Sequence, residues 1–198
     1  MDKDRTADID WNSELVDQLE WHWDNQLRPR LDGLSDAEYF WQPVPGCWTI
    51  SRRGESDAPI SAGAGDFTMD YSLERTDPEP VTTIGWRLAH IIVGVFASRN
   101  ATHFGGPPAD YRTWEYAPTA TEALRQLDDA HAAWIAGVRG LGAAGLAFCT
   151  GPEEADGQYA DAPFAALVLH IHREAIHHGA EISLLRDLYQ WKPDRDRL

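Results

Sequence analysis

Residues 167–189 have the sequence LVLHIHREAIHHGAEISLLRDLY, and this stretch decides much of the fold. Its apolar residues recur at helical spacing, which predicts one long helix. Glu174 and His178 are four residues apart, so their side chains lie one above the other on one helix face. The apolar residues on or beside that face are Ile171, Ala175, Ile182 and Leu185. A buried carboxylate and imidazole need a partner, and a metal ion suits both.

Three earlier segments also have apolar residues at helical spacing, at about residues 11–31, 82–103 and 119–141. In the first of them, the predicted buried side repeats every four residues. It consists of Trp11, Leu15, Leu19, Trp23, Leu27 and Leu31. Pro29 is expected to kink or fray the last turn of this helix. With the final helix, which is expected to end at about Gln190, the chain has four long helices.

Threonines stand at the expected starts of the second and third helices. Thr82 or Thr83 is predicted to cap the second helix, because a threonine hydroxyl can accept a bond from a free backbone N–H group. Thr119 followed by Glu122 fits a capping box for the third helix. The glycines and prolines at 105–108 should end the second helix.

The first two helices are joined by a long stretch, residues 35–80, that is rich in Gly, Pro, Ser and Asp. We expect it to be irregular and to pack as a cap, with a short helix near 36–41. A second loop is predicted at 142–160. After it, Asp161 is expected to cap the last helix, with Pro163 in the first turn.

Four long helices with long connections favour an all-α fold, namely a four-helix bundle with an irregular connection between helices 1 and 2. A chain of 198 residues is enough for one domain. We therefore expect a single domain over 1–198, with its core at about 11–190. Metal sites in such bundles form from side chains on facing helices.

The chain is strongly acidic, since 17 Lys and Arg face 32 Asp and Glu and give a net charge of −15. This charge argues against nucleic acid and against anionic membranes as partners. No apolar run approaches the roughly 20 residues that cross a bilayer. The polar start is no signal peptide, and two distant cysteines form no disulfide framework. A reducing cytoplasm is the expected location.

His90 is the best candidate for a third metal ligand, because it lies centrally in the second helix among apolar residues. A catalytic metal usually takes three protein ligands and keeps one position open. A histidine on such a face is, however, more often a core residue that makes a hydrogen bond. From spacing alone, the metal and the core interpretations of His90 both stay open.

The last helix offers competing pairs, because His170 is four residues from Glu174 and His177 is four residues from Glu181. The adjacent His177 and His178 point about 100° apart, so they cannot both face one core metal. The pair of His177 and Glu181 fits a surface contact. His172 projects to another side of the helix. The apolar residues beside Glu174 and His178 slightly favour that pair as the ligands. The roles of His170, His172, His177 and Glu181 stay undecided.

Two of these segments together resemble the DinB-like superfamily, also called DinB/YfiT-like. They are TIGWRLAHI around His90 and EAIHHGAEISLLRDLY from Glu174 onward. Residues 31–50, LDGLSDAEYFWQPVPGCWTI, resemble the connection between helices 1 and 2 in actinobacterial members. The resemblance covers roughly residues 11–190.

The resemblance implies an up-down-down-up four-helix bundle with a divalent metal in its core. The usual ligands of the superfamily are a histidine on helix 2 and the pattern H-x-x-x-H on the last helix. In this chain they correspond to His90, Glu174 and His178, so a glutamate replaces one histidine. That departure is similar to the mycothiol-dependent maleylpyruvate isomerase branch. Zinc is the expected metal, or another divalent ion such as nickel. Relatives are often dimers, and the apolar helix faces would permit a homodimer.

Three functions follow, in order of preference. The first is a transferase or isomerase that depends on mycothiol or another small thiol such as bacillithiol or glutathione, in which the metal activates a thiolate to attack a small electrophilic substrate. The second is a metal-dependent hydrolase that uses metal-bound water, with His177 or Glu181 as proton acceptor. The third is a non-catalytic metal-binding module in a stress response.

Overall fold

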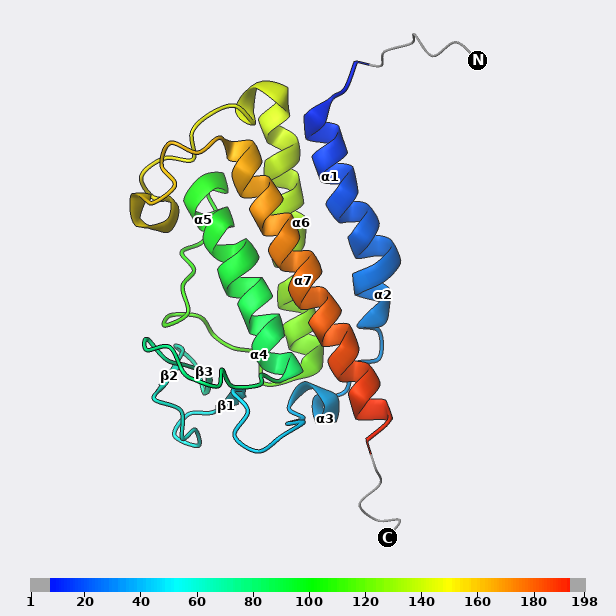
Figure 1. The fold of residues 1–198 in the computed structure, drawn as a ribbon, viewed down its shortest axis with the longest axis vertical. Coiled ribbons are helices and arrows are strands. Elements are labelled where there is room, and N and C mark those ends of the chain that lie inside the picture. The colour runs from blue at the N-terminus through cyan, green and yellow to red at the C-terminus, as the bar shows by residue number, and fades with distance from the viewer. Residues whose placement is uncertain (1–7, 193–198) are drawn as a thin grey trace.

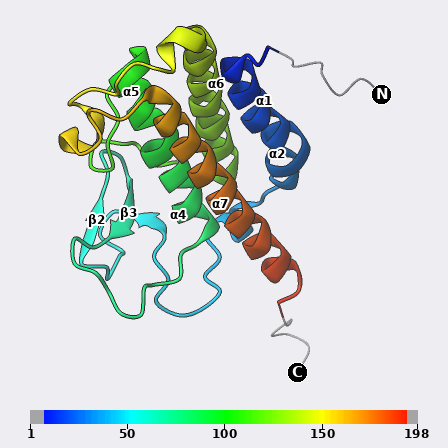
Figure 2. The same cartoon turned by 45° about the horizontal axis from the view of Figure 1, so that its top comes forward.

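The computed structural model describes residues 8–192, and most of this part of the chain is helical (Figure 1). Four long helical segments lie side by side in both views (Figures 1 and 2). The first consists of α1 (Trp11–His22), the π-helical turn η1 (Trp23–Leu27) and α2 (Arg28–Arg30). The second consists of α4 (Ile84–Ala89), the π-helical η2 (His90–Ala97) and α5 (Ser98–Phe104). The other two are α6 (Ala120–Gly145) and α7 (Phe164–Gln190). The prediction of a mostly helical chain is confirmed.

α1 and α7 run in one direction, and the other two segments run in the opposite direction (Figure 1). α1 contacts α6 and α7, while η2 contacts the same two helices from the other side. The core between the segments is apolar, and its largest fully buried side chains include Leu19, Ile84, Leu88, Ile91, Leu127, Trp134 and Ile171. Within residues 8–192, no helix has both the length and the apolar character that crossing a membrane requires.

The buried side of α1 differs from the predicted stripe at its start. Trp11 was expected in the core, but its side chain is 62% exposed, and Val16 is buried instead. A repeat of four residues drifts by about 40° at each step around an α-helix, because each residue turns it by about 100°. Trp23 and Leu27 remain buried, and they lie in the wider π-helical turn η1, which partly offsets that drift.

The predicted threonine caps at the starts of the second and third helical segments are confirmed. Thr83 caps α4, since its hydroxyl accepts a bond from the backbone N–H of Trp86 at 3.2 Å. Thr119 caps α6 in the same way through the N–H of Glu122 at 3.2 Å. The carboxylate of Glu122 binds Arg125 instead of returning to the cap, so the predicted capping box is only half formed. The regular part of α6 ends at Gly142, whose φ is +60°.

The predicted start of α7 is wrong by two residues. Pro163 takes the cap position in an extended conformation, and α7 begins at Phe164. The chain before α7 pairs with the segment that follows α6, through bonds from the N–H of Phe164 to the carbonyl of Phe148 and from Thr150 to Ala162. The residues just before Pro163 form turns, with the N–H of Ala162 bound to the carbonyl of Tyr159, and Asp161 therefore lies outside the helix.

The connection between the first two helical segments is not irregular throughout, so the all-α prediction needs correction. It contains α3 (Asp36–Tyr39), which confirms the predicted short helix, and a three-stranded antiparallel sheet. The strands are β1 (Ile50–Arg52), β2 (Ile60–Ala62) and β3 (Phe67–Tyr71), in the order β1-β3-β2. Strands this short carry too few alternations to stand out among turn residues. The sheet packs on α4, where the indole N–H of Trp86 donates to the carbonyl of Asp70 at 2.7 Å.

Candidate metal centre

His90, Glu174 and His178 lie together where η2 packs against α7. One candidate ligand atom from each residue lies within 4.8 Å of those from the other two. All three residues are half-buried. The structure thus brings together the three residues that the sequence predicted as ligands, although they come from helical segments far apart in the chain.

The imidazole of His178 is oriented by Glu181, which lies one turn further along α7. Its Nδ1 atom is 2.6 Å from Oε2 of Glu181. A carboxylate only accepts hydrogen bonds, so the ring proton lies on Nδ1. The other nitrogen, Nε2, then carries a free lone pair, and it lies 3.5 Å from Oε2 of Glu174. That separation is long for a hydrogen bond, so neither atom satisfies the other and both are available to a shared partner.

Arg87 of α4 completes this arrangement from the neighbouring helix. Its guanidinium makes a close ion pair with the same Oε2 atom of Glu181. Arg87 is also 3.1 Å from Nδ1 of His178, but both groups are donors there, so both donate to Glu181. Metal-binding histidines are usually held in this way, with the second ring nitrogen donating to a carboxylate.

His90 is held by Tyr111, which belongs to the segment between α5 and α6. The Nδ1 atom of His90 lies 2.7 Å from the Tyr111 hydroxyl, which leaves Nε2 for another partner. Burial is the main reason that the pKa of His90 falls to about 4, and the neighbouring His178 lowers it further. Its imidazole is therefore neutral at pH 7, which is the state that can bind a metal. Burial also raises the pKa of Tyr111 to about 12, so its hydroxyl keeps its proton.

Gly94 makes room for this contact. It lies one turn after His90 on η2, and a Cβ atom there would overlap the Tyr111 hydroxyl and stand 2.8 Å from its Cζ. It would also lie 3.3 Å from Nδ1 of His90. The absence of a side chain at position 94 is therefore a condition for the bond between Tyr111 and His90.

A cavity of about 450 Å³ opens beside the three residues. His90 and Glu174 line it together with Tyr111, Arg99 and His170. Its walls come from η2, α5, the segment at 109–111 and α7. A small molecule in this cavity would therefore lie next to two of the three candidate ligands.

A second group of residues could also hold an ion, namely His177, His178 and Glu181. It shares His178 with the first group, and His177 lies 3.4 Å from Glu181. The side chain of His177 is 63% exposed, and Glu181 is already bound by Arg87. The first group is less exposed and borders a cavity, so it has the better geometry for a metal centre.

The remaining histidines of α7, His170 and His172, belong to neither group of candidate ligands. His170 lines the cavity, and its Nδ1 lies 2.6 Å from Arg173 and 3.5 Å from Glu174. His172 is buried on the side that faces α1, where its Nδ1 lies 2.9 Å from Oε1 of Gln18. His172 is therefore a core residue.

The sequence reasoning missed Arg87, Arg99 and Tyr111. Arg87 is three residues before His90 and Gly94 is four residues after it, so their helical spacing from His90 was a usable signal. No comparable signal identifies Tyr111, because it lies in a non-helical segment and reaches His90 through the fold.

Comparison with known proteins gives one match. A family model described as the DinB superfamily matches residues 18–182, which include every residue of the candidate centre. No match was found among curated proteins or among solved structures.

Proposed function

Since the chain belongs to the DinB superfamily, we propose that it is a metal-binding protein that catalyses a thiol-dependent transfer or isomerisation. In this proposal the four helical segments form one domain with the up-down-down-up bundle of the superfamily. His90, Glu174 and His178 hold one divalent cation, zinc or nickel. The substrates are a small thiol, such as mycothiol, and a small electrophile.

The observation that carries the proposal is that Nδ1 of both imidazoles is already engaged. Nδ1 of His178 contacts Glu181 and Nδ1 of His90 contacts the Tyr111 hydroxyl, so Nε2 is the nitrogen that each ring presents to an ion. Two neutral nitrogens and one carboxylate oxygen are a donor set that suits zinc and related divalent ions. Three protein ligands leave a further position free for a substrate atom.

The residues around His90, Glu174 and His178 would orient these three ligands and balance the charge of the ion. Glu181 and Arg87 fix the ring plane of His178, and Tyr111 fixes that of His90. Glu174 makes the ligand set one unit more negative than three neutral histidines would be. A bound divalent cation lowers the pKa of a coordinated thiol, so that the thiol loses its proton near neutral pH. The cavity beside His90 and Glu174 gives both substrates access.

The resemblance of the His, Glu and His set to the mycothiol-dependent isomerase branch supports a thiol as the substrate that reaches the free position. The alternative is a metal-dependent hydrolase. Its proton acceptor would be His170, which lines the same cavity and would first have to release the Arg173 N–H that its Nδ1 accepts. Glu181 is less suited to that role than the sequence suggested, because Arg87 and His178 already bind it.

Elemental analysis of the purified protein, alone and after incubation with zinc, is the first test. We expect about one metal ion per chain in wild type, loss of the ion in His178→Ala and retention in His177→Ala, which changes the exposed neighbouring histidine. A wild-type protein that stays free of metal after incubation would end both the thiol and the hydrolase proposals.

Activity then separates the two enzymatic functions. The metal-loaded protein is incubated with chlorodinitrobenzene and a small thiol, and with a nitrophenyl ester without thiol. A thiol-dependent rate above the spontaneous reaction, lost in His178→Ala, supports thiol transfer. Ester hydrolysis that is the same with and without thiol would instead favour the hydrolase.

A further inference from the structure

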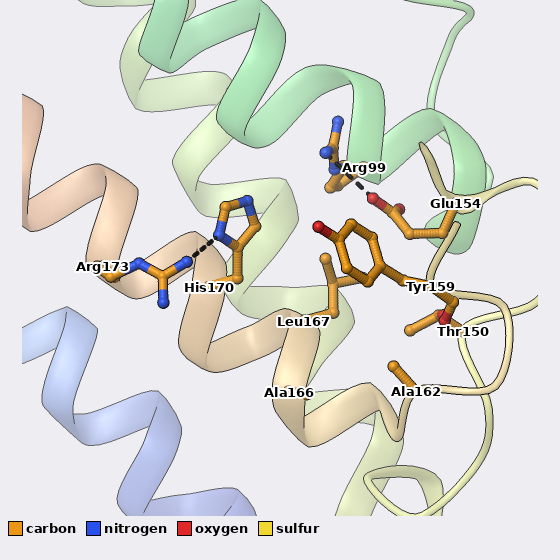
Figure 3. A pocket seen from close by; sticks show the side chains of 9 residues that line it. All are labelled: Arg99, Thr150, Glu154, Tyr159, Ala162, Ala166, Leu167, His170 and Arg173. Carbon is orange, nitrogen blue, oxygen red and sulfur yellow. Dashed lines mark hydrogen bonds and ion pairs between the residues drawn. The ribbon is translucent and has the colours of Figure 1, made fainter. Parts of the chain in front are cut away.

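A second cavity, of about 270 Å³, adjoins the one beside the candidate metal centre. It lies between α5, the loop at 150–162 and α7, as Figure 3 shows. Arg99 and His170 line both cavities, so the two spaces meet at these side chains. A molecule with one end at Glu174 that passes beside His170 would reach the second cavity.

The walls of this cavity are rich in hydrogen-bond donors. Arg99 and Arg173 enter it from different helices, and the Tyr159 hydroxyl points into the space near Arg99 (Figure 3). Arg173 donates to Nδ1 of His170 at 2.6 Å, so the ring proton of a neutral His170 lies on Nε2, which is a further donor. This concentration of donors contrasts with the net charge of −15 of the chain.

Among the described residues that line this cavity, Glu154 is the one carboxylate, and its two oxygens are engaged. One binds Arg99 at 3.1 Å, and the other lies 2.9 Å from Nε2 of His103. Its side chain is only 4% exposed. Glu154 therefore fixes the position of Arg99 more than it competes for a ligand, although it offsets one positive charge.

Arg173 is more available. Its side chain is 69% exposed, and the nearest carboxylate oxygen, Oε1 of Glu174, is 3.6 Å from its Nε. That distance is too long for a good hydrogen bond. Two arginines and one glutamate leave a single net positive charge in the cavity, which suits a monoanion.

From these contacts we infer that the second cavity binds a carboxylate group of the ligand whose reactive end lies at the metal centre. Arginine suits a carboxylate because its planar N–H groups match the two oxygens. The substrate class is therefore a small molecule that carries a carboxylate several bonds from its reactive group. The position of the reactive end rests on the proposed function, whereas the carboxylate site does not.

Paired thiol probes test the inference on the cobalt-loaded protein, where a thiol bound to cobalt produces an absorption band. The probes are mercaptohexanoate and mercaptohexanol, which differ in charge at the far end. We expect the carboxylate probe to bind wild type about tenfold more tightly than the alcohol, as one charge-assisted hydrogen bond would give. Arg173→Gln should remove most of this preference and leave the dissociation constant of mercaptohexanol unchanged.

Two variants control this result. Arg139→Gln removes another exposed arginine, which pairs with Glu20 elsewhere on the surface, and it should keep the preference. Arg99→Gln alone would leave the buried Glu154 without its partner, so it is combined with Glu154→Gln. This double variant should lose the preference as Arg173→Gln does.

Binding of hexanoate, measured by calorimetry, identifies the source of the carboxylate and separates the two proposals. If neither thiol gives a band but hexanoate binds wild type and binds Arg173→Gln about tenfold more weakly, the carboxylate site stands and the thiol function fails. A further outcome is that both thiols bind equally, while hexanoate binds the complex with mercaptohexanol and binds it more weakly in Arg173→Gln. In that case the carboxylate belongs to the electrophile. Equal binding of both thiols, with no binding of hexanoate that depends on Arg173, would overturn the inference.

Discussion

Nδ1 of His178 lies 2.6 Å from Oε2 of Glu181, and this contact determines which nitrogen of the imidazole is free. Arg87 binds the same carboxylate oxygen, which holds the side chain of Glu181 in place. The geometry makes Glu181 a positioning residue for His178 instead of a ligand in its own right.

Glu181→Gln should weaken metal binding about 10- to 100-fold, because the amide is a poorer acceptor for the Nδ1 proton and Arg87 loses its ion pair. The measurement is competition for zinc with a chelator of known affinity. His177→Ala is the matched comparison. If it weakened binding as much as Glu181→Gln, the ligands would be His177, His178 and Glu181 instead.

Gly94→Ala should also reduce metal affinity, by about tenfold or more, although no ligand changes. The new methyl group would overlap the Tyr111 hydroxyl, so Tyr111 must move and His90 loses its hydrogen bond. Tyr111→Phe, which removes the hydroxyl without overlap, should have a similar effect. The same competition with a chelator measures the metal affinity of wild type, Gly94→Ala and Tyr111→Phe.

Gly140→Ala is the control for the change in helix propensity. Gly140 lies within α6, and a Cβ there meets no atom within 4 Å. Its metal affinity should equal that of wild type, and its stability should rise by about 0.5–1 kcal/mol. An unchanged affinity in Gly94→Ala would show that Tyr111 does not hold His90 for the metal.

The sequence predicted the helices and the closeness of Glu174 and His178 because both depend on local spacing. Four residues place two side chains on one helix face whatever the rest of the fold does. The contact of Arg87 with Glu181 and that of Tyr111 with His90 depend on how separate segments pack. Such contacts leave no periodic pattern in the sequence, so only the structure identifies them.

The strands and the burial of Trp11 were mispredicted for a related reason. β1 and β2 have three residues each, and their pairing with β3 decides their conformation more than their own sequence does. Trp11 matched an apolar repeat of four, but a repeat of four follows the buried face of an α-helix for only a few turns. The exposure of Trp11 follows from helix geometry, which the spacing of apolar residues in the sequence does not include.

His131 should make the protein less stable in acid. Its ring stacks on Trp23 at a centroid distance of 3.7 Å, and burial is the main reason that its pKa falls from 6.5 to about 4. Protonation is therefore easier in the unfolded chain. The stability that depends on a neutral His131 is complete above pH 6.5 and is lost as the pH falls from 6.5 to about 4.

The share of His131 in the loss at pH 5, relative to pH 7.5, should be about 2 kcal/mol, at about 1.4 kcal/mol per pH unit. Urea unfolding at the two pH values, with a chelator present to exclude metal effects, gives the free energies. His131→Gln should lose about 2 kcal/mol less than wild type between them. His177→Gln, a change at an exposed position, should lose as much as wild type. Equal losses in wild type and His131→Gln would contradict the prediction.

Arg186 joins the end of the first helical segment to α7 and should be among the most sensitive positions for stability. Its Nε donates to Oε1 of Glu38 at 3.1 Å, and both side chains are buried. Its Nη1 donates to the backbone carbonyls of Arg30, the last residue of α2, and of Asp32, just after that helix. Arg186→Ala leaves a buried carboxylate and two carbonyls without this partner, so the free energy of unfolding should fall by about 3 kcal/mol or more.

Arg139→Ala provides the comparison for this change, because Arg139 forms an exposed ion pair with Glu20. Exposed pairs contribute about 0–1 kcal/mol, so this variant should unfold at nearly the urea concentration of wild type. Combining Arg186→Ala with Glu38→Gln should recover part of the loss, since the second change removes the buried charge. If Arg186→Ala and Arg139→Ala proved equally mild, the pair of Arg186 and Glu38 would not hold α7 to α3.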